Sequence, residues 1–501
     1  MKSQIENSSP IYEPIRDAIP PKKASSWLYK IHPYFTRQPL NVVEEYIKHF
    51  CPINGLVLDP FCGSGVVAAA ALANQRKAMC LDIDPLACFI TTNTCETGIN
   101  FDQINLLFQE ISKRMSRIIK FVERASVNEI ASYKIKKWFP ANVKLPLNAD
   151  RQYVDEMFTK RNLIIMSHLI DIINDLSDEK ARQFFLFTFS SALDKMSIMY
   201  RAPEVGKNHG GGSGLFLVYR YWVPPTPGLK DAWVAFSESF GRVLKAKQVS
   251  NKLFGDYTAN KNSTFLVYND SADNLPNYVK EASVDYIFTD PPYGAHIAYL
   301  DLSTMYRAWL KLPFNNDFKR KEAIEGGDLS HSNEHYLKVL SDSFEKMFIA
   351  LKEEAWMSLV YFHKNPNLWY SIRDMMKYIG FTYVNVVAQP LSNKSFHKVK
   401  RPLRVLGESL VVNFKKSSKR IFAVPMSLPL ANIIKNVAER VIYKNGGATT
   451  EEILREVVPD LFENELFIDA ATKSMSDILG ILESDFDIDR NSLWQIRSER
   501  T

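Results

Sequence analysis

One sequence feature restricts the possible folds more than any other. It is a short apolar strand that ends in a glycine turn, which leads directly into a helix. The strand is Val57-Leu58-Asp59, the turn contains Gly63 and Gly65, and an alanine-rich helix runs from Val66 to Ala73. A further apolar strand, residues 78–81, follows at once. Strands that alternate with helices form a parallel sheet with helices on its faces, so the sequence predicts an α/β fold.

The glycine turn also predicts a ligand. Residues 63–68 fit the pattern G-x-G-x-x-G/A, and a carboxylate follows at Asp82. Such a turn lets a cofactor lie against the backbone at a helix N-terminus, and the later acid can bind ribose hydroxyls. Because NAD, FAD and S-adenosylmethionine all contain adenosine, the pattern indicates an adenosine ligand and leaves the rest of that ligand open.

The length of 501 residues exceeds one ordinary domain core, and the pattern divides into four parts. Residues 1–100 hold an N-terminal segment and the first half of the α/β domain, and residues 101–255 are a mostly helical insertion. Residues 256–420 resume the sheet, with Arg404 to Phe414 predicted as its last strand, antiparallel and at the edge. Residues 421–501 combine helices with an alternating hairpin pattern and resemble a winged-helix module.

Composition excludes several protein classes. The chain has no apolar run of membrane-spanning length, and its first residues lack the apolar core of a signal peptide. We therefore expect a cytoplasmic protein without membrane contact. The five cysteines all fall between residues 51 and 95 without a C-x-x-C pair, which predicts reduced thiols packed in a core rather than a metal site or disulfides.

A second motif lies far downstream, where a predicted strand over residues 284–288 ends at Asp290-Pro291-Pro292-Tyr293. Together with Asp59-Pro60-Phe61 and the glycine turn, it resembles the signature motifs of S-adenosylmethionine-dependent DNA amino-methyltransferases, in particular the adenine-N6-specific DNA methylases of the DPPY type. The resemblance covers most of residues 24–415. It implies a Rossmann-like class I methyltransferase sheet, with the helical insertion as a candidate target-recognition region.

The resemblance also implies how the methyl donor is held. Asp59 is expected at the charged end of S-adenosylmethionine, Asp82 at the ribose with Asp84 as second choice, and Asp270 at the adenine amino group. A segment around Pro33, Thr36 and Pro39 occupies the place of the family's donor-contacting motif. A helix cap for Asp82 or Asp84 and a turn for Asp270 stay open as structural alternatives. The full expected cofactor set is Asp59, Pro60, Phe61, Gly63, Ser64, Gly65, Asp82, Asp84 and Asp270.

The residue types of the second motif suit chemistry on the exocyclic amine of a nucleobase. That amine is a weak nucleophile because its lone pair is conjugated into the ring. The Asp290 carboxylate and the Pro291 carbonyl can accept its two N–H bonds and localise the lone pair on nitrogen, while Tyr293 offers a face for stacking an extruded base. The expected catalytic residues are Asp290, Pro291, Pro292 and Tyr293.

Alternatives to a site-specific adenine-N6 methyltransferase of DNA remain open. An aspartate at the first motif position favours adenine, but cytosine-N4 of DNA or guanine-N2 of RNA would need the same chemistry. Gly294, directly after the motif, also occurs in RNA guanine-N2 enzymes. An NAD-dependent oxidoreductase would use the glycine turn but leave Asp290 to Tyr293 unexplained. A catalytically silent nucleic-acid-binding subunit would not need all four motif positions.

Charge along the chain predicts where double-stranded DNA binds. Between Lys394 and Arg420 there are nine lysines and arginines against one acid. Residues 451–489 are strongly acidic, which favours contact with protein there instead. The expected phosphate contacts are Lys394, Lys398, Lys400, Arg401 and Arg404. Restriction or phage-defence partner proteins and the target sequence are left open by the sequence.

Overall fold

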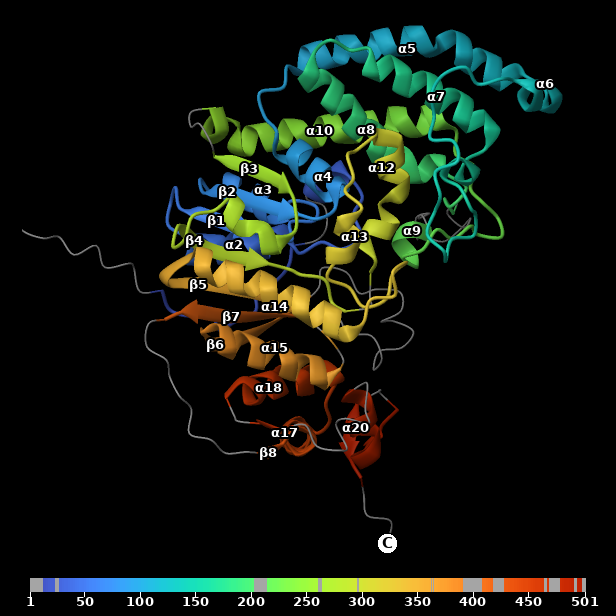
Figure 1. Ribbon diagram of the computed structural model, residues 1–501. Coiled ribbons are helices and arrows are strands. Elements are labelled where there is room, and N and C mark those ends of the chain that lie inside the picture. Colours follow the sequence, from blue (N-terminus) through green and yellow to red (C-terminus); the bar gives the residue numbers. More distant parts are fainter. Residues whose placement is uncertain are drawn as a thin grey trace, which may run out of the picture.

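The structure is a computed structural model that describes residues 12–22, 27–201, 214–259, 264–294, 297–361, 363, 365–390, 408–417, 428–463, 466–467, 478–490 and 493–497. A seven-stranded sheet in the order β3-β2-β1-β4-β5-β7-β6 forms its centre (Figure 1). The strands are β1 (Leu56–Asp59), β2 (Lys77–Asp82), β3 (Phe265–Asn269), β4 (Val284–Thr289), β5 (Leu351–Tyr361), β6 (Phe381–Pro390) and β7 (Glu408–Lys416).

The first five strands of this order are paired in parallel, and only β7 runs against its two neighbours. Although β1 and β4 lie far apart in the sequence, Leu58 is paired with Ile287 in the middle of the sheet. The order confirms the expected Rossmann-like class I methyltransferase sheet. One detail of the prediction was wrong: β7 is antiparallel as expected, but it lies between β5 and β6, and β6 forms the edge.

Side chains that alternate along each strand build two separate cores, because successive residues of a strand point to opposite faces. On one face Val57, Tyr286 and Phe288 pack with helices α2 (Leu40–Phe50) and α3 (Val66–Ala73). On the other face Leu58 and Ile287 pack with α14 (Asn333–Ala350) and α15 (Pro366–Ile379). All five cysteines are buried as free thiols.

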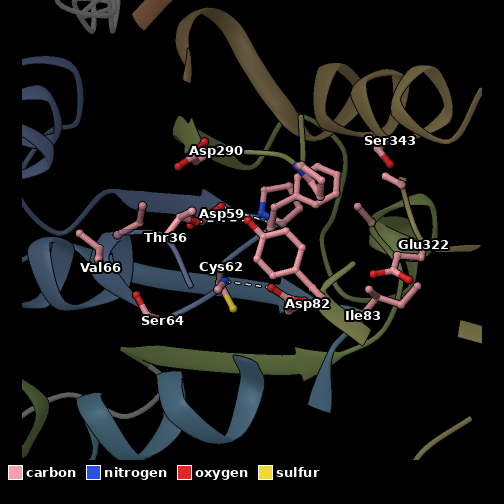
Figure 2. Close-up of a pocket in the computed structure, with 18 of the residues that line it drawn as sticks. Thr36, Asp59, Cys62, Ser64, Val66, Asp82, Ile83, Asp290, Glu322 and Ser343 are labelled. Atoms are coloured by element: carbon pink, nitrogen blue, oxygen red, sulfur yellow. Dashed lines mark hydrogen bonds between the residues drawn. The ribbon is translucent and has the colours of Figure 1, made fainter. Parts of the chain in front are cut away.

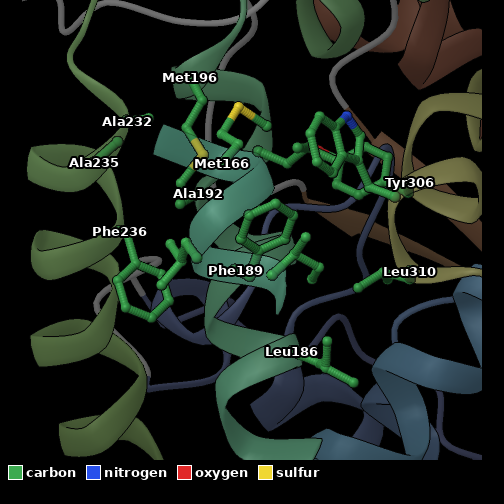
Figure 3. Close-up of a cluster of buried hydrophobic side chains, with 14 of the residues drawn as sticks. Met166, Leu186, Phe189, Ala192, Met196, Ala232, Ala235, Phe236, Tyr306 and Leu310 are labelled. Carbon is green, nitrogen blue, oxygen red and sulfur yellow. The ribbon is translucent and has the colours of Figure 1, made fainter. Parts of the chain in front are cut away.

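The helical insertion covers one side of the sheet (Figure 1). Its core is shared with α12 (Thr304–Leu310), which follows the Asp290 motif, since Tyr306 and Leu310 lie with Phe189 and Met196 in one buried cluster (Figure 3). The insertion is therefore fixed to the second half of the sheet. Its elements are α5 (Phe101–Arg124), α6 (Val127–Ser132), η1 (Val154–Met157), α7 (Lys160–Asn174), α8 (Glu179–Met196), α9 (Gly214–Leu217) and α10 (Ala232–Ala259).

The C-terminal part packs against the lower end of the sheet in Figure 1. Phe462 of α18 (Thr450–Glu463) stacks on Tyr383 of β6, with 4.8 Å between ring centroids. The expected hairpin is present as β10 (Phe486–Ile488) antiparallel to β11 (Trp494–Ile496). The other elements here are β8 (Leu428–Pro429), α17 (Leu430–Asn445), β9 (Leu466–Phe467) and α20 (Ile478–Asp485). This unit thus shares the hydrophobic core of the sheet rather than standing apart.

The N-terminal segment covers the edge strand β6. Gln389 donates to the Ile19 carbonyl and accepts from the Ile19 amide, both at 3.0 Å, and Asn385 donates to the Ile15 carbonyl at 2.7 Å. The remaining short elements are α1 (Trp27–Ile31), α4 (Pro85–Cys95), η2 (Ala272–Asn277), α11 (Tyr299–Leu302) and α13 (Asp317–Lys321). Within the described ranges, no helix combines the length and apolarity needed to cross a lipid bilayer.

Candidate active site

One cavity at the carboxyl ends of β1, β2 and β4 is lined by both sequence motifs (Figure 2). It encloses about 900 Å³, its open mouth included. The lining residues from the first motif and the end of β2 are Asp59, Pro60, Phe61, Gly63, Ser64 and Asp82, and those from the second motif are Asp290 and Pro292. Residues about 230 positions apart in the sequence therefore face the same space.

Two glycines shape the turn between β1 and α3. Gly63 and Gly65 have φ values of +48° and +77°, in the left-handed region that favours glycine. A Cβ on Gly65 would lie 2.9 Å from the Thr91 hydroxyl and 3.0 Å from its Cα, so the turn also needs glycine for packing. The Gly63 amide donates to Asp82 Oδ2 at 2.9 Å, and the Gly65 amide to the Cys62 carbonyl at 2.8 Å.

These bonds bear on the kind of ligand that fits. A dinucleotide pyrophosphate binds free backbone amides at a helix N-terminus, but the amides of Gly63 and Gly65 are taken by partners within the protein. The cavity wall there also carries the carboxylates of Asp59 and Asp82, which repel an anion. The site therefore suits a cationic adenosine compound better than NAD.

Asp59 supplies a buried negative group for such a cation. Its Oδ1 accepts from the Thr289 hydroxyl at 2.9 Å and from the Phe61 amide at 3.2 Å. No described residue donates to Oδ2, although the side chain is only 3% exposed. Burial raises the pKa of Asp59 well above its usual value, so a positive charge in the cavity would favour its ionised form.

Asp82 is the acid at the end of β2 that faces the cavity. Its Oδ1 accepts from the Asp84 amide and its Oδ2 from the Gly63 amide, both at 2.9 Å. Each oxygen keeps a second lone pair, so the carboxylate can accept further hydrogen bonds from a sugar diol. Burial raises the pKa of this carboxyl group well above its usual value.

Three predicted cofactor contacts, Gly65, Asp84 and Asp270, lie outside the cavity lining. Asp84 is fully buried as the N-cap of α4, where it accepts from the Leu86 amide at 3.0 Å. Asp270 does follow β3, but its oxygens accept from Ser271, Asn274 and Tyr278 at 2.8 Å each. The structural alternatives, a helix cap and a turn, therefore describe Asp84 and Asp270, whereas the neighbouring Ser271 and Ala272 line the cavity.

Sequence reasoning missed several residues of the cavity. Glu322 lines its far end, and burial raises the pKa of this carboxyl group to about 8. The segment around Thr36 contributes Tyr34, Thr36, Arg37 and Gln38, of which only Thr36 was singled out. The polar run Thr36-Arg37-Gln38 between an aromatic pair and a proline was the available signal. For Glu322 the sequence carries no motif.

Asp290 lies at the carboxyl end of β4 and carries a hydrogen bond on each oxygen. Gln38 Nε2 donates to Oδ2 at 2.8 Å, and the Tyr293 hydroxyl donates to Oδ1. Burial raises the pKa of Asp290 to about 6, and the two hydrogen bonds oppose that rise. Asp290 is thus mainly ionised at neutral pH, but its pKa is close enough to neutral that it can accept a proton there.

The other motif residues are held by aromatic neighbours. The Pro292 carbonyl accepts from the Tyr336 hydroxyl at 2.9 Å, and the Tyr293 ring meets Tyr361 edge-on, 5.6 Å between centroids. Among the described residues none donates to the Pro291 carbonyl, so that acceptor is available. Pro291 and Tyr293 lie beside the cavity rather than in its lining.

The five basic residues expected to contact DNA, Lys394, Lys398, Lys400, Arg401 and Arg404, lie outside the described residues. Their role as phosphate contacts stays a prediction. In the part of the chain that the structure describes, no group of three or more histidine, cysteine or acidic side chains is arranged to hold a metal ion.

The polar and apolar groups that line the cavity fit S-adenosylmethionine. Asp59 Oδ2 is an acceptor without a partner in the described residues and suits the donor's cationic end, and Asp82 suits its ribose. Apolar side chains of Ile83, Ala272 and Ala323 also line the cavity and offer surface for a flat adenine. The sheet and this cavity together define the class: a class I methyltransferase fold with S-adenosylmethionine as cofactor.

Comparison with known proteins shows similarity to DNA methylases. Residues 6–93, which carry the glycine turn, match the sequence model of a family described as "DNA methylase". The chain is also 23% identical over 268 residues to the Type II methyltransferase M.MvaI of Kocuria varians, a match that covers 52% of each protein. The chain thus spans about half the length of this curated relative.

Similarity to solved structures is weak. TrmN from Thermus thermophilus is 10% identical, with a TM-score of 0.26 over 76% of this chain and 49% of that one. The rRNA methyltransferase aviRa from Streptomyces viridochromogenes is 10% identical, with a TM-score of 0.27 over 78% of this chain and 90% of that one. Scores this low carry no functional argument.

Proposed function

We propose that the protein is a site-specific DNA methyltransferase that methylates the exocyclic N6 amine of adenine. The observation that carries the proposal is the single cavity onto which both the glycine turn and Asp290 open. A methyl group can pass directly between two reactants only if both reach the same space, and holding them aligned contributes about 7–11 kcal/mol to the barrier reduction in favourable cases.

The proposed roles follow from the contacts of each residue. S-adenosylmethionine, when bound, supplies an electrophilic methyl group. Asp59 offsets the positive charge of the donor, and Asp82 orients its ribose. Asp290 and the Pro291 carbonyl accept the two N–H bonds of the target amine, which localises the amine's lone pair. Asp290 also accepts the amine's surplus proton at a carboxylate oxygen, consistent with its pKa of about 6.

A base inside a duplex cannot reach a cavity at the end of the sheet, so the target base has to leave the stack. Extrusion of one base costs a few kcal/mol, and stacking on an aromatic ring returns roughly 1–3 kcal/mol. Tyr293 is assigned this stacking role because its ring adjoins Asp290 and rests edge-on against Tyr361.

Transfer of a labelled methyl group tests the proposal. Duplex DNA, duplex DNA without adenine and structured RNA are offered in parallel, and the methylated nucleoside is identified after digestion. N6-methyladenine from adenine-containing DNA alone is expected. Formation of N4-methylcytosine would keep the enzyme class but make cytosine the target base. The family match does not distinguish these two bases. Methylation of RNA alone would contradict the proposal.

The substitution Asp290→Asn tests the assigned site. It keeps the size of the side chain but removes the charge, and transfer is expected to fall by at least about 100-fold because the acceptor of the developing charge is weakened. Calorimetric binding of S-adenosylmethionine should be retained. Asp342→Asn, on the exposed surface of α14, serves as the matched control with unchanged activity. Undiminished transfer by Asp290→Asn would overturn the role of Asp290.

A further inference from the structure

Asp290 receives its two hydrogen bonds from two different parts of the chain. One donor, the Tyr293 hydroxyl, belongs to the same loop as Asp290. The other, Gln38 Nε2, belongs to the segment before α2, 252 positions away in the sequence, and holds Oδ2 at 2.8 Å. A target amine that donates to Asp290 therefore has to share an oxygen with one of these two donors or displace that donor.

The backbone around Gln38 is anchored by its neighbours. Arg37 donates to the carbonyls of Leu28 and His32 at 2.7 and 3.0 Å. The Gln38 carbonyl accepts from the Tyr29 hydroxyl at 3.2 Å, and the next residue, Pro39, is the N-cap of α2. With both sides held, the Gln38 amide can keep one orientation relative to Asp290.

The same segment contacts the glycine turn. Arg37 Nε donates to the Ser64 hydroxyl at 2.9 Å, directly beside the residue that contacts Asp290. The consecutive side chains of Arg37 and Gln38 thus connect the glycine turn with the Asp290 carboxylate. The position of Asp290 relative to the donor site depends on this connection.

Tyr293 is the partner that can leave. Its assigned role is to stack on the target base, and a ring turned toward the base no longer keeps its hydroxyl on Oδ1. Gln38 has no such second role, and its neighbours hold it in place. Departure of Tyr293 frees Oδ1 for the amine while Oδ2 remains bound.

We propose that Gln38 is a positioning residue of the methyl-transfer site: it holds Oδ2 of Asp290 throughout the reaction, so that Oδ1, once Tyr293 has released it, accepts the target amine. This inference rests on the proposed function. A carboxylate held by one fixed donor keeps the orientation that in-line attack requires. The Gln38 amide also favours the ionised form of Asp290, which accepts hydrogen bonds more strongly than the protonated form.

The test compares Gln38→Met with the wild type in single-turnover methyl transfer at saturating S-adenosylmethionine over a range of pH. Methionine has a similar length but donates no hydrogen bond. The rate is expected to fall by about 10- to 100-fold, in line with losing one bond to a charged group. The acid limb is expected at higher pH in the variant than in the wild type, because the Gln38 hydrogen bond that lowers the pKa of Asp290 is lost.

Tyr293→Phe distinguishes the two donors. The pH dependence of kcat/KM reports the free enzyme, and that of single turnover from the bound complex reports the complex. Tyr293→Phe should shift the acid limb of kcat/KM only, since its hydroxyl has left Asp290 in the complex. Gln38→Met should shift both acid limbs. An equal shift of both limbs in Tyr293→Phe would overturn the proposed exchange.

Controls separate this inference from the folding of the segment and from the proposed function. Binding of S-adenosylmethionine reports folding, and Lys48→Gln, on the exposed face of α2, should leave every profile unchanged. If Gln38→Met does not bind S-adenosylmethionine, Gln38→Glu takes its place. This variant keeps the length of the side chain and places a second carboxyl group beside Asp290. A slower rate with an unmoved acid limb overturns the positioning role. A wild type without transfer overturns the proposed function instead.

Discussion

At the scale of single residues, neighbouring acids with similar sequence surroundings have different surroundings in the fold. Asp82 is the last residue of β2 and Asp84 lies two positions further, yet Asp82 faces the cavity and Asp84 caps a helix. The proline directly after Asp84 is the distinguishing signal, because proline is favoured at the first helical position after an N-cap. Asp59 and Asp290, by contrast, lie in the cavity as their motifs predicted.

The residues that sequence reasoning missed are held by tertiary contacts. Gln38 reaches Asp290 only because the sheet brings β4 beside β1, and Glu322 reaches the cavity from a segment with no regular pattern. A motif predicts residues that are close to one another in the chain. It cannot predict which distant side chains complete the site.

The substitution Gly65→Ala tests the glycine turn. A left-handed φ of +77° and a contact of 2.9 Å with the Thr91 hydroxyl both oppose a methyl group here. Unfolding in denaturant should show a loss of about 2–4 kcal/mol, with weaker S-adenosylmethionine binding.

Gly241→Ala in α10 is the matched control for that substitution. It has nothing within 4 Å of an added Cβ and should gain about 0.5–1 kcal/mol, because alanine is the better helix former. Equal stability changes at Gly65 and Gly241 would contradict the account of the turn.

At the scale of helices and strands, the wrong prediction of an edge position for β7 has a physical reason. Chain order suggested that the last strand closes the sheet. The run Leu410-Val411-Val412 is apolar on both faces, which is typical of an interior strand. The polar side chains of Asn385 and Gln389 mark β6 as the edge, and they bind the N-terminal segment that covers it. The burial pattern was thus more informative than chain order.

A capping box begins helix α18. The Glu452 amide donates to the Thr449 hydroxyl at 3.2 Å, and the Thr449 amide donates to the Glu452 carboxylate at 2.7 Å. Thr449→Ala should lower the free energy of unfolding by about 1 kcal/mol, since an amide at the helix start loses its acceptor. Thr449→Ser keeps the hydroxyl and should cost far less. Equal losses in thermal unfolding would show that the methyl group, not the cap, matters.

At the scale of the whole molecule, the sequence predicts the α/β class, the interrupting helical insertion and the C-terminal hairpin. These features depend on periodicity and turn residues, which are local. The packing between parts is not local: Trp309 of α12 lies against Phe158 and Phe189 of the insertion, and Phe462 lies against β6. Because such contacts depend on shape across distant segments, the boundaries of the four predicted parts stay predictions.

The basic stretch from Lys394 to Arg420 predicts how DNA binding depends on salt. Each phosphate contact contributes about −0.9 to the slope of log affinity against log salt for duplex DNA. Substituting Lys398→Gln together with Arg401→Gln should make the slope shallower by about 2 and weaken binding to all sequences. Lys48→Gln with Lys338→Gln, exposed on α2 and α14, is the comparison pair. An unchanged slope in the first pair would show that DNA passes elsewhere.

The hydrogen bonds between Gln389 and Ile19 and between Asn385 and Ile15 also determine when, during synthesis, the N-terminal segment can cover the edge of the sheet. The earliest of these residues leave the ribosome long before β6 has been translated. Before β4 has been translated, the nascent chain carries only β1, β2 and β3 of the sheet, and β1 has a free edge. Exposed strand edges of this kind invite pairing with other chains. Residues 15–19 can therefore shield the edge of β6 only after that strand, 370 positions further along the chain, has been translated.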